Sequence, residues 1–124
     1  KQKKNKKIIL TNIGKEKALK YFITDAKIKK PKKWDKKWRI IIFDIPENKK
    51  NVRDVIRNRL KQFAFYQLQK SVWVHPFDCQ ELILSLKYVY DLNRYVQYIV
   101  AETIETEINL VDHFLELKIL NIKD

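Results

Sequence analysis

The sequence predicts an α+β fold, a ferredoxin-like (βαββαβ-type) sandwich with helices packed on one face of a sheet. From residue 38 onward, strand-like and helix-like spacings of apolar residues alternate in the order strand, helix, strand, helix, strand, helix. The second strand-like stretch is long enough to be a broken pair of strands. With 124 residues, 45% of them hydrophobic, the chain has the size and apolar content of one compact domain.

The first 26 residues resemble the end of another domain. Residues 8–11 form a short apolar run typical of a strand, and Gly14, the only glycine in the chain, indicates a turn. Residues 15–22 follow with apolar residues at helical spacing. These elements are too short to bury their apolar faces alone. We therefore expect this chain, which does not begin with Met, to be part of a longer protein.

A lysine-rich linker is expected at residues 27–37, where seven of the eleven positions are Lys. Repulsion among these charges, together with Pro31, disfavours regular structure. Trp34 and Trp38 interrupt and follow the lysine run. Because tryptophan side chains are costly to leave in water, we expect the linker to dock on another surface.

The first elements after the linker are a strand and a helix. Residues 38–43 are rich in β-branched and aromatic side chains, which is typical of a central strand buried on both faces. This strand ends at Asp44. Asn48 is predicted to cap a helix over residues 48–64, with apolar residues on one side and basic residues on the other.

The remaining elements follow the same two periodicities. Residues 66–75 alternate like a strand and are stopped by Pro76, after which a helix is predicted. Residues 93–102 alternate again. A last amphipathic helix is predicted over residues 105–117, with Ile108 on its buried side.

Positive charge is concentrated in the N-terminal third. The chain has 27 Lys and Arg against 15 Asp and Glu, a net charge of +12. Residues 1–39 hold 16 basic and 3 acidic side chains, a net of +13, and residues 40–124 hold 11 and 12, a net of −1. This local excess favours a nucleic-acid contact. No apolar run is long enough for a membrane span, and a single cysteine excludes a disulfide scaffold and a multi-cysteine zinc site.

Three stretches together resemble PaaX-type transcriptional repressors. Residues 34–47, WDKKWRIIIFDIPE, are similar to the opening of the central domain of that family, and residues 67–78, QLQKSVWVHPFD, to its second block. Residues 9–14, ILTNIG, followed by a helix, resemble the wing strand and last helix of a winged helix-turn-helix. The central domain of these repressors is itself similar to the CRISPR-associated ferredoxin-like endoribonuclease.

The resemblance implies three parts. These are a winged-helix remnant over residues 1–26, a basic linker over residues 27–37, and a ferredoxin-like dimerisation domain over residues 38–124. The sequence departs from the family in the turn before the first strand of that domain. There the family usually has Gly, whereas Lys36 or Lys37 stands here.

Asp44 is the candidate catalytic and metal-ligating residue. The resemblance to the endoribonuclease family implies that an Asp at this strand end binds magnesium, with one carboxylate from each subunit. Two facing carboxylates could hold Mg²⁺ and activate water for phosphodiester attack. The alternative, which we favour because only Glu47 lies near in sequence, is a structural Asp that hydrogen-bonds the turn leading into Pro46.

Three neighbouring residues have structural interpretations. Ser71, in the second matching block, has no adjacent base and is expected to serve the sheet edge or a dimer contact. His75 is expected at the surface or in a loop beside Pro76. Cys79 is expected to be a small apolar filler at the start of a helix.

Basic residues in two regions are candidates for nucleic-acid binding. Lysines of a wing and linker would contact phosphates, which gives affinity and salt dependence but not sequence choice. On the helix at residues 48–64, basic residues form a stripe, for which a solvated face is the favoured alternative. The candidates are Lys3, Lys4, Lys6, Lys7, Lys29, Lys30, Lys32, Lys33, Lys50, Arg53 and Arg57.

The sequence therefore predicts part of a DNA-binding transcriptional regulator similar to the PaaX repressors, whose ferredoxin-like domain forms a homodimer. One alternative is a CRISPR-associated adaptation protein, either a Mg²⁺-dependent endonuclease or an integrase scaffold. Another is an interaction module in which the lysines only increase solubility.

The expected partners are duplex DNA and a second copy of the chain, with a small-molecule effector left open for the full-length protein and no membrane. No cofactor is expected, apart from Mg²⁺ in the nuclease alternative. A cytoplasmic location is expected.

Overall fold

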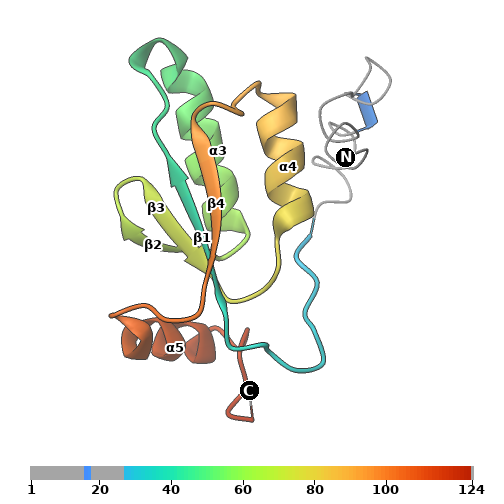
Figure 1. Cartoon of the computed structure of the whole chain (residues 1–124), viewed down its shortest axis with the longest axis vertical. Helices are drawn as coiled ribbons and strands as arrows, with labels where there is room; N and C mark the ends of the chain where they lie inside the picture. Colours follow the sequence, from blue (N-terminus) through green and yellow to red (C-terminus); the bar gives the residue numbers. More distant parts are fainter. Residues whose placement is uncertain (1–15, 18–26, 124) are drawn as a thin grey trace.

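The computed structural model describes residues 16–17 and 27–123 (Figure 1). The strand and helix predicted within the winged-helix remnant lie outside the described residues, apart from Glu16 and Lys17, which are helical. No helix in the described ranges combines the length and apolar character that crossing a membrane requires. The elements are β1 Trp38–Phe43, η2 Glu47–Lys49, α3 Lys50–Gln62, β2 Tyr66–Gln69, β3 Val72–His75, α4 Gln80–Val89, β4 Val96–Ala101 and α5 Glu107–Glu116.

The strands form one antiparallel sheet in the order β2-β3-β1-β4. On the central strand β1, Ile41 lies opposite Trp73 of β3 and Tyr98 of β4. The stretch at residues 66–75 is a hairpin of two strands, β2 and β3, with Lys70 and Ser71 in the turn. Two interleaved βαβ units produce this order, so the ferredoxin-like prediction is confirmed.

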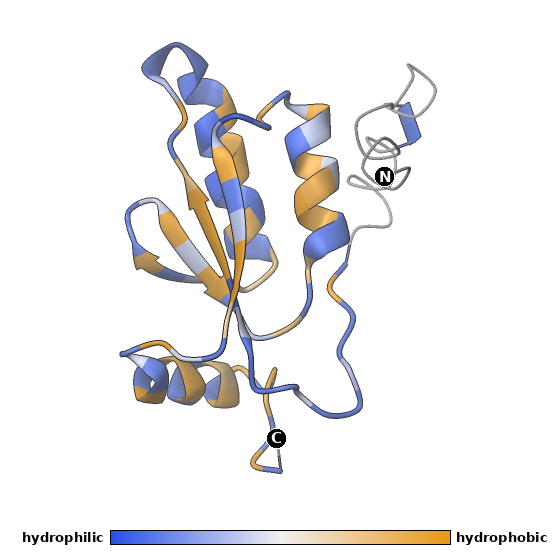
Figure 2. Cartoon of the chain, in the orientation of Figure 1, coloured by the Kyte–Doolittle hydropathy of each residue, from blue (hydrophilic) through white to orange (hydrophobic). Residues whose placement is uncertain are grey.

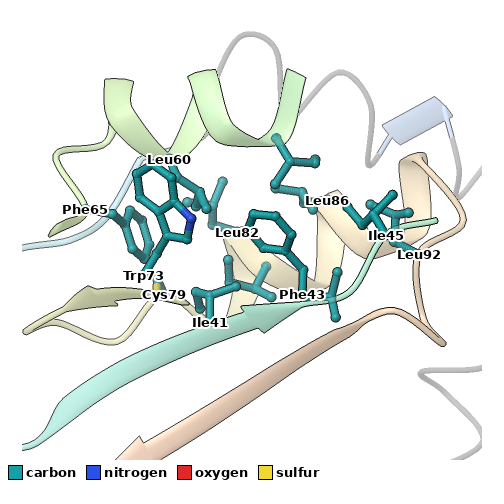
Figure 3. Close-up of a cluster of buried hydrophobic side chains, with 13 residues drawn as sticks. Ile41, Phe43, Ile45, Leu60, Phe65, Trp73, Cys79, Leu82, Leu86 and Leu92 are labelled. Carbon is teal, nitrogen blue, oxygen red and sulfur yellow. The ribbon is translucent and has the colours of Figure 1, made fainter. Parts of the chain in front are cut away.

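The main core lies between the sheet and the helices α3 and α4 (Figure 3). Ile41, Phe43 and Trp73 point from the sheet into this core, each no more than 2% exposed. Leu60 of α3 and Leu82 of α4 pack against them. Each fully buried apolar side chain of this size contributes roughly 1.5–3 kcal/mol relative to an exposed one.

Helix α5 packs on the opposite face of the sheet. Because side chains alternate along a strand, Trp38 and Val74 point away from the main core and contact a second cluster that includes Leu110 and Phe114 of α5. The expectation that all helices share one face is therefore wrong for α5. Ile108, expected on the buried side, is 77% exposed, because it lies about 200° around the helix from Leu110 at roughly 100° per residue.

Part of the sheet face on the α5 side remains exposed. Ile42 of β1 and Ile99 of β4 point to this side and are 36% and 38% exposed. In the described part of the chain, β4 is the last strand of the sheet, and its Val100 is 51% exposed. The sheet thus presents apolar side chains beside an edge that pairs with no other strand among the described residues.

The start of α3 differs from the prediction. The short 3-10 turn η2 occupies Glu47–Lys49, and α3 begins at Lys50 with Lys49 in the cap position and no capping side chain. Asn48 is therefore not the N-cap. The two sides of α3 do differ as expected, with hydrophilic residues facing outward (Figure 2).

All three α-helices from residue 27 onward end in Schellman-type turns. The residue after each C-cap is left-handed, with φ of 65° at Ala64, 57° at Asp91 and 62° at Lys118. The N–H groups of this residue and the next donate to carbonyls of the last helical turn. Glycine usually occupies such a position, but the chain has only Gly14, so each turn holds a side chain in the left-handed region at about 1–2 kcal/mol.

Candidate nucleic-acid interface

Asp44 lies at the end of β1, where the sheet meets two other segments. Its side chain is exposed, and its backbone N–H donates to the carbonyl oxygen of Tyr95 at 2.8 Å. The preceding residue, Phe43, donates its N–H to the carbonyl oxygen of Ser71 at 3.1 Å. Asp44 and Ser71 therefore flank the same end of the sheet.

A magnesium site at Asp44 would need protein ligands beyond those that the described residues bring together. Among residues 16–17 and 27–123, no three His, Cys, Asp or Glu side chains gather closely enough to hold a metal ion. The nearest acid in sequence, Glu47, instead accepts a hydrogen bond from Arg53 at 3.5 Å. Asp44 thus offers one carboxylate per chain, as a two-subunit site would require, and its catalytic and metal roles stay a prediction.

The basic residues on α3 are partly engaged by neighbouring acids. Arg53 lies 3.5 Å from Glu47, and Arg57 lies 3.9 Å from Asp54. Their side chains are only 20% and 24% exposed. Lys50 is exposed. The stripe is therefore less free to contact a phosphate backbone than its sequence pattern suggests, and its nucleic-acid role stays a prediction.

Trp34 and Asp35 of the linker, together with Arg39 of β1, form what we call the linker clamp. Trp34 is 5% exposed, meets Trp38 edge-on at 4.8 Å between ring centroids, and donates its Nε1–H to the carbonyl of Lys37 at 2.9 Å. Arg39 forms a bidentate ion pair with the Asp35 carboxylate, in which Nη1 and Nη2 donate to Oδ1 and Oδ2 at 2.9 and 2.7 Å. The expected docking of the linker is confirmed at Trp34.

Arg39 also connects the linker to the segment that follows β3. Its Nη1 donates to the carbonyl of Pro76 at 2.9 Å, and the residue is 8% exposed. This arrangement raises the pKa of Arg39, chiefly through the hydrogen bond to Asp35, and lowers the pKa of Asp35 for the same reason. Because the Asp35 side chain is 47% exposed, solvent weakens the ion pair, and packing of Trp34 carries much of the attachment.

Lys36 occupies the turn in which a glycine is usual among the PaaX-type repressors. Its φ is 68°, in the left-handed region that favours glycine. The Lys36 ammonium lies 5.8 Å from the centre of the Trp34 ring, within range of a cation–π contact. The turn therefore keeps the geometry for which glycine is suited.

The linker borders an open cavity of about 540 Å³, which we call the linker cavity. One wall contains Lys27, Lys29, Lys30 and Lys33, and the other contains residues 76–82 at the start of α4. Of the linker lysines predicted to bind nucleic acid, Lys29, Lys30 and Lys33 line this cavity and Lys32 does not. The wing lysines Lys3, Lys4, Lys6 and Lys7 lie outside the described residues.

His75 is buried, so the expectation of a surface histidine is wrong. It is 3% exposed, and its ring packs against Phe65, Phe77 and Phe114 at 4.9 to 5.6 Å between centroids. Its Nδ1 accepts a hydrogen bond from the N–H of Phe77 at 3.1 Å. Burial, helped by the nearby Arg39 charge, lowers the pKa of His75 to about 3, so the ring is neutral at physiological pH.

Cys79 is a buried residue with no reactive character. It is 3% exposed at the start of α4, and burial raises the pKa of its thiol to about 12. The Tyr98 hydroxyl accepts from the N–H of Cys79 at 3.2 Å and lies 3.2 Å from Oδ1 of Asp78, to which it donates. The interpretation of Cys79 as an apolar filler is confirmed.

Sequence reasoning missed the linker clamp. The spacing of Asp35 and Arg39 was the available signal, but it lies in a lysine run whose charge favours an unstructured linker. The tryptophans indicated docking, and Arg39 supplied the specific contact.

The chain matches a model of a protein family. The model described as the PaaX protein central Cas2-like domain matches residues 31–110, which is more than half of the chain. The match runs from the linker through β4 into the first turn of α5. No curated protein and no solved structure gives a significant match.

Proposed function

Because the chain belongs to the PaaX family and contains its central Cas2-like domain, we propose that it is part of a transcriptional regulator that binds DNA as a dimer. The observation that carries the DNA contact is the charge distribution, with a net of +13 in residues 1–39 and −1 in the remainder. The linker clamp supports this proposal, because it attaches the basic segment to the folded domain. The Cas2-like domain would hold two basic segments at a fixed separation.

DNA binding by the whole chain should depend steeply on salt. Contacts to phosphates release counterions, so binding that engages six or more phosphates should weaken by roughly 10³-fold or more between 50 and 200 mM salt. Fluorescence anisotropy with a labelled duplex of random sequence measures this directly. An absence of binding at 50 mM salt would contradict the proposal and favour a module in which the lysines only add solubility.

The dimer contact is proposed at the exposed sheet face around Ile42 and Ile99, next to the edge strand β4. Replacing Ile99 with Glu should convert the dimer to a monomer in sedimentation velocity, because a charge would then be buried between the copies. Ile108→Glu tests the rival surface on α5, which is 77% exposed at this residue. Leu84→Glu on α4 is the control and should leave the dimer intact. A wild-type chain that is monomeric at all concentrations rules this contact out.

A metal-dependent endonuclease is the second candidate function. The exposed Asp44 at the end of β1, next to the backbone of Ser71, is the observation that favours it. If this function holds, Mg²⁺ should support cleavage of RNA or DNA by the wild type, and Asp44→Ala should lower the rate by at least 100-fold. Asp54→Ala, on α3, is the matched control. Equal activity of the wild type and Asp44→Ala would exclude Asp44 as the catalytic residue.

A further inference from the structure

We propose that the linker cavity is a binding site for backbone phosphates of duplex DNA, so that the Cas2-like domain itself takes part in the DNA contact. This inference rests on the proposed DNA-binding function. It adds a defined location, the space between the linker and the start of α4, and a defined set of cations.

Four cations share one wall of this cavity. Lys27, Lys29, Lys30 and Lys33 line it, and all four are exposed. Among the described residues, none of these four lysines takes part in an ion pair. Ammonium groups with this freedom can each approach a phosphate oxygen, and the linker clamp restrains the backbone that carries them.

On the other wall, two backbone N–H groups already donate hydrogen bonds within the chain. The N–H of Cys79 donates to the Tyr98 hydroxyl at 3.2 Å, and the N–H of Gln80 donates to Oδ1 of Asp78 at 3.0 Å. The N–H groups of Cys79 and Gln80 therefore already have acceptors. The four lysines, and not the start of the helix, carry the proposal.

The acids of the cavity do not cancel its positive charge. Asp35, Asp78 and Glu81 line it together with the four lysines and Arg39, so five cations face three carboxylates, a net of +2. Asp35 and Arg39 neutralise one another through their two hydrogen bonds. Four lysines then remain against two carboxylates, which favours an anion.

DNA is the occupant that the surroundings favour. The cavity is open, and further lysines, Lys32, Lys36 and Lys37, continue along the same linker outside it. A repeating polyanion can contact all of these cations, whereas a single small phosphate can contact only those inside the cavity.

A pair of charge-matched variants tests the site. Replacing the four cavity lysines with Gln should reduce the salt-dependent loss of DNA affinity between 50 and 200 mM by roughly 100-fold, if each lysine neutralises one phosphate. The control replaces Lys49, Lys70, Lys118 and Lys123 with Gln, the same change in net charge away from the cavity, and should keep the wild-type salt dependence. Equal effects of the two variants would overturn the cavity site and leave the proposed DNA binding in place. A wild type that binds no DNA would overturn the proposed function itself.

A second pair of variants tests for tighter DNA binding. Glu81→Gln removes a carboxylate from the cavity wall and should tighten DNA binding about threefold at low salt, whereas Glu116→Gln on α5 should leave it unchanged.

Inorganic pyrophosphate, added at constant ionic strength, probes the other source of phosphate groups. Pyrophosphate binding that requires the four cavity lysines, together with DNA binding that does not, would overturn the DNA assignment in favour of a small phosphate ligand.

Discussion

Replacing Trp38 with alanine is expected to lower the free energy of unfolding by about 3–5 kcal/mol. Trp38 is fully buried at 0% exposure, and its ring lies 4.8 Å from that of Trp34 and 6.3 Å from that of Phe114. It therefore joins the linker, β1 and α5. Since domains of this size are stable by only about 5–15 kcal/mol, this loss would take a large share of the total.

Trp38→Phe is the matched control. It keeps an aromatic ring in the cluster and removes the indole Nε1–H, a buried donor to which none of the described residues offers an acceptor. Removing an unsatisfied donor offsets part of the lost packing, so this variant should lose less than half as much stability as Trp38→Ala. Urea unfolding with an unchanged slope measures both variants. A loss of less than about 1 kcal/mol for Trp38→Ala would contradict the central place assigned to this side chain.

Acid should destabilise the protein through His75. In the unfolded chain the imidazole has its ordinary pKa of 6.5, whereas burial and the Arg39 charge lower the folded pKa to about 3. Between these two pKa values the unfolded state therefore binds a proton that the folded state does not bind. The stabilisation that a neutral His75 gives to the folded state is fully present above pH 6.5. As the pH falls from 6.5 towards 3, the free energy of unfolding should decrease by about 1.4 kcal/mol per pH unit.

A variant that cannot titrate isolates this effect. His75→Asn places a carbonyl oxygen where Nδ1 accepts the N–H of Phe77, so the local hydrogen bond has a replacement. Its free energy of unfolding should lose the slope between pH 6.5 and 4, and His113→Gln should retain it. Arg39 lowers the pKa of the Asp35 carboxyl, so this group adds a further loss of folding stability only when the pH falls below its ordinary pKa of 3.8. A slope that persists in His75→Asn would show that another group causes it.

The strands and helices of the Cas2-like domain could be predicted because each has a single dominant periodicity. The apolar run of β1 and the alternation of β4 both reflect direct contact with the core. The side of the sheet that α5 covers could not be predicted. The spacing of apolar residues along a helix indicates that one side is buried, but it does not indicate which surface of the protein covers that side. Ile108 shows the limit, since Leu110 and Phe114 define a different side of the same helix.

The environment of His75 was also beyond the reach of the sequence. Pro76 follows it and suggests a surface loop, but the residues that enclose His75 come from three separate segments, at Phe65, Phe77 and Phe114. Asp44 was placed correctly at a strand end, because strand ends can be read from the apolar run that precedes them. A second carboxylate facing Asp44 would have to come from the proposed dimer partner, whose position does not follow from periodicity within one chain.

From residue 15 to the end, the chain contains no glycine, although four residues of the described part are left-handed: Lys36, Ala64, Asp91 and Lys118. Glycine at these positions would relax the folded backbone but would also widen the unfolded ensemble, at a cost of about 0.5–1 kcal/mol per residue in conformational entropy. This entropy term offsets about half of the 1–2 kcal/mol that each left-handed side chain costs in the folded state. The absence of glycine therefore costs this fold some stability, and in return it narrows the range of conformations that the unfolded chain must search.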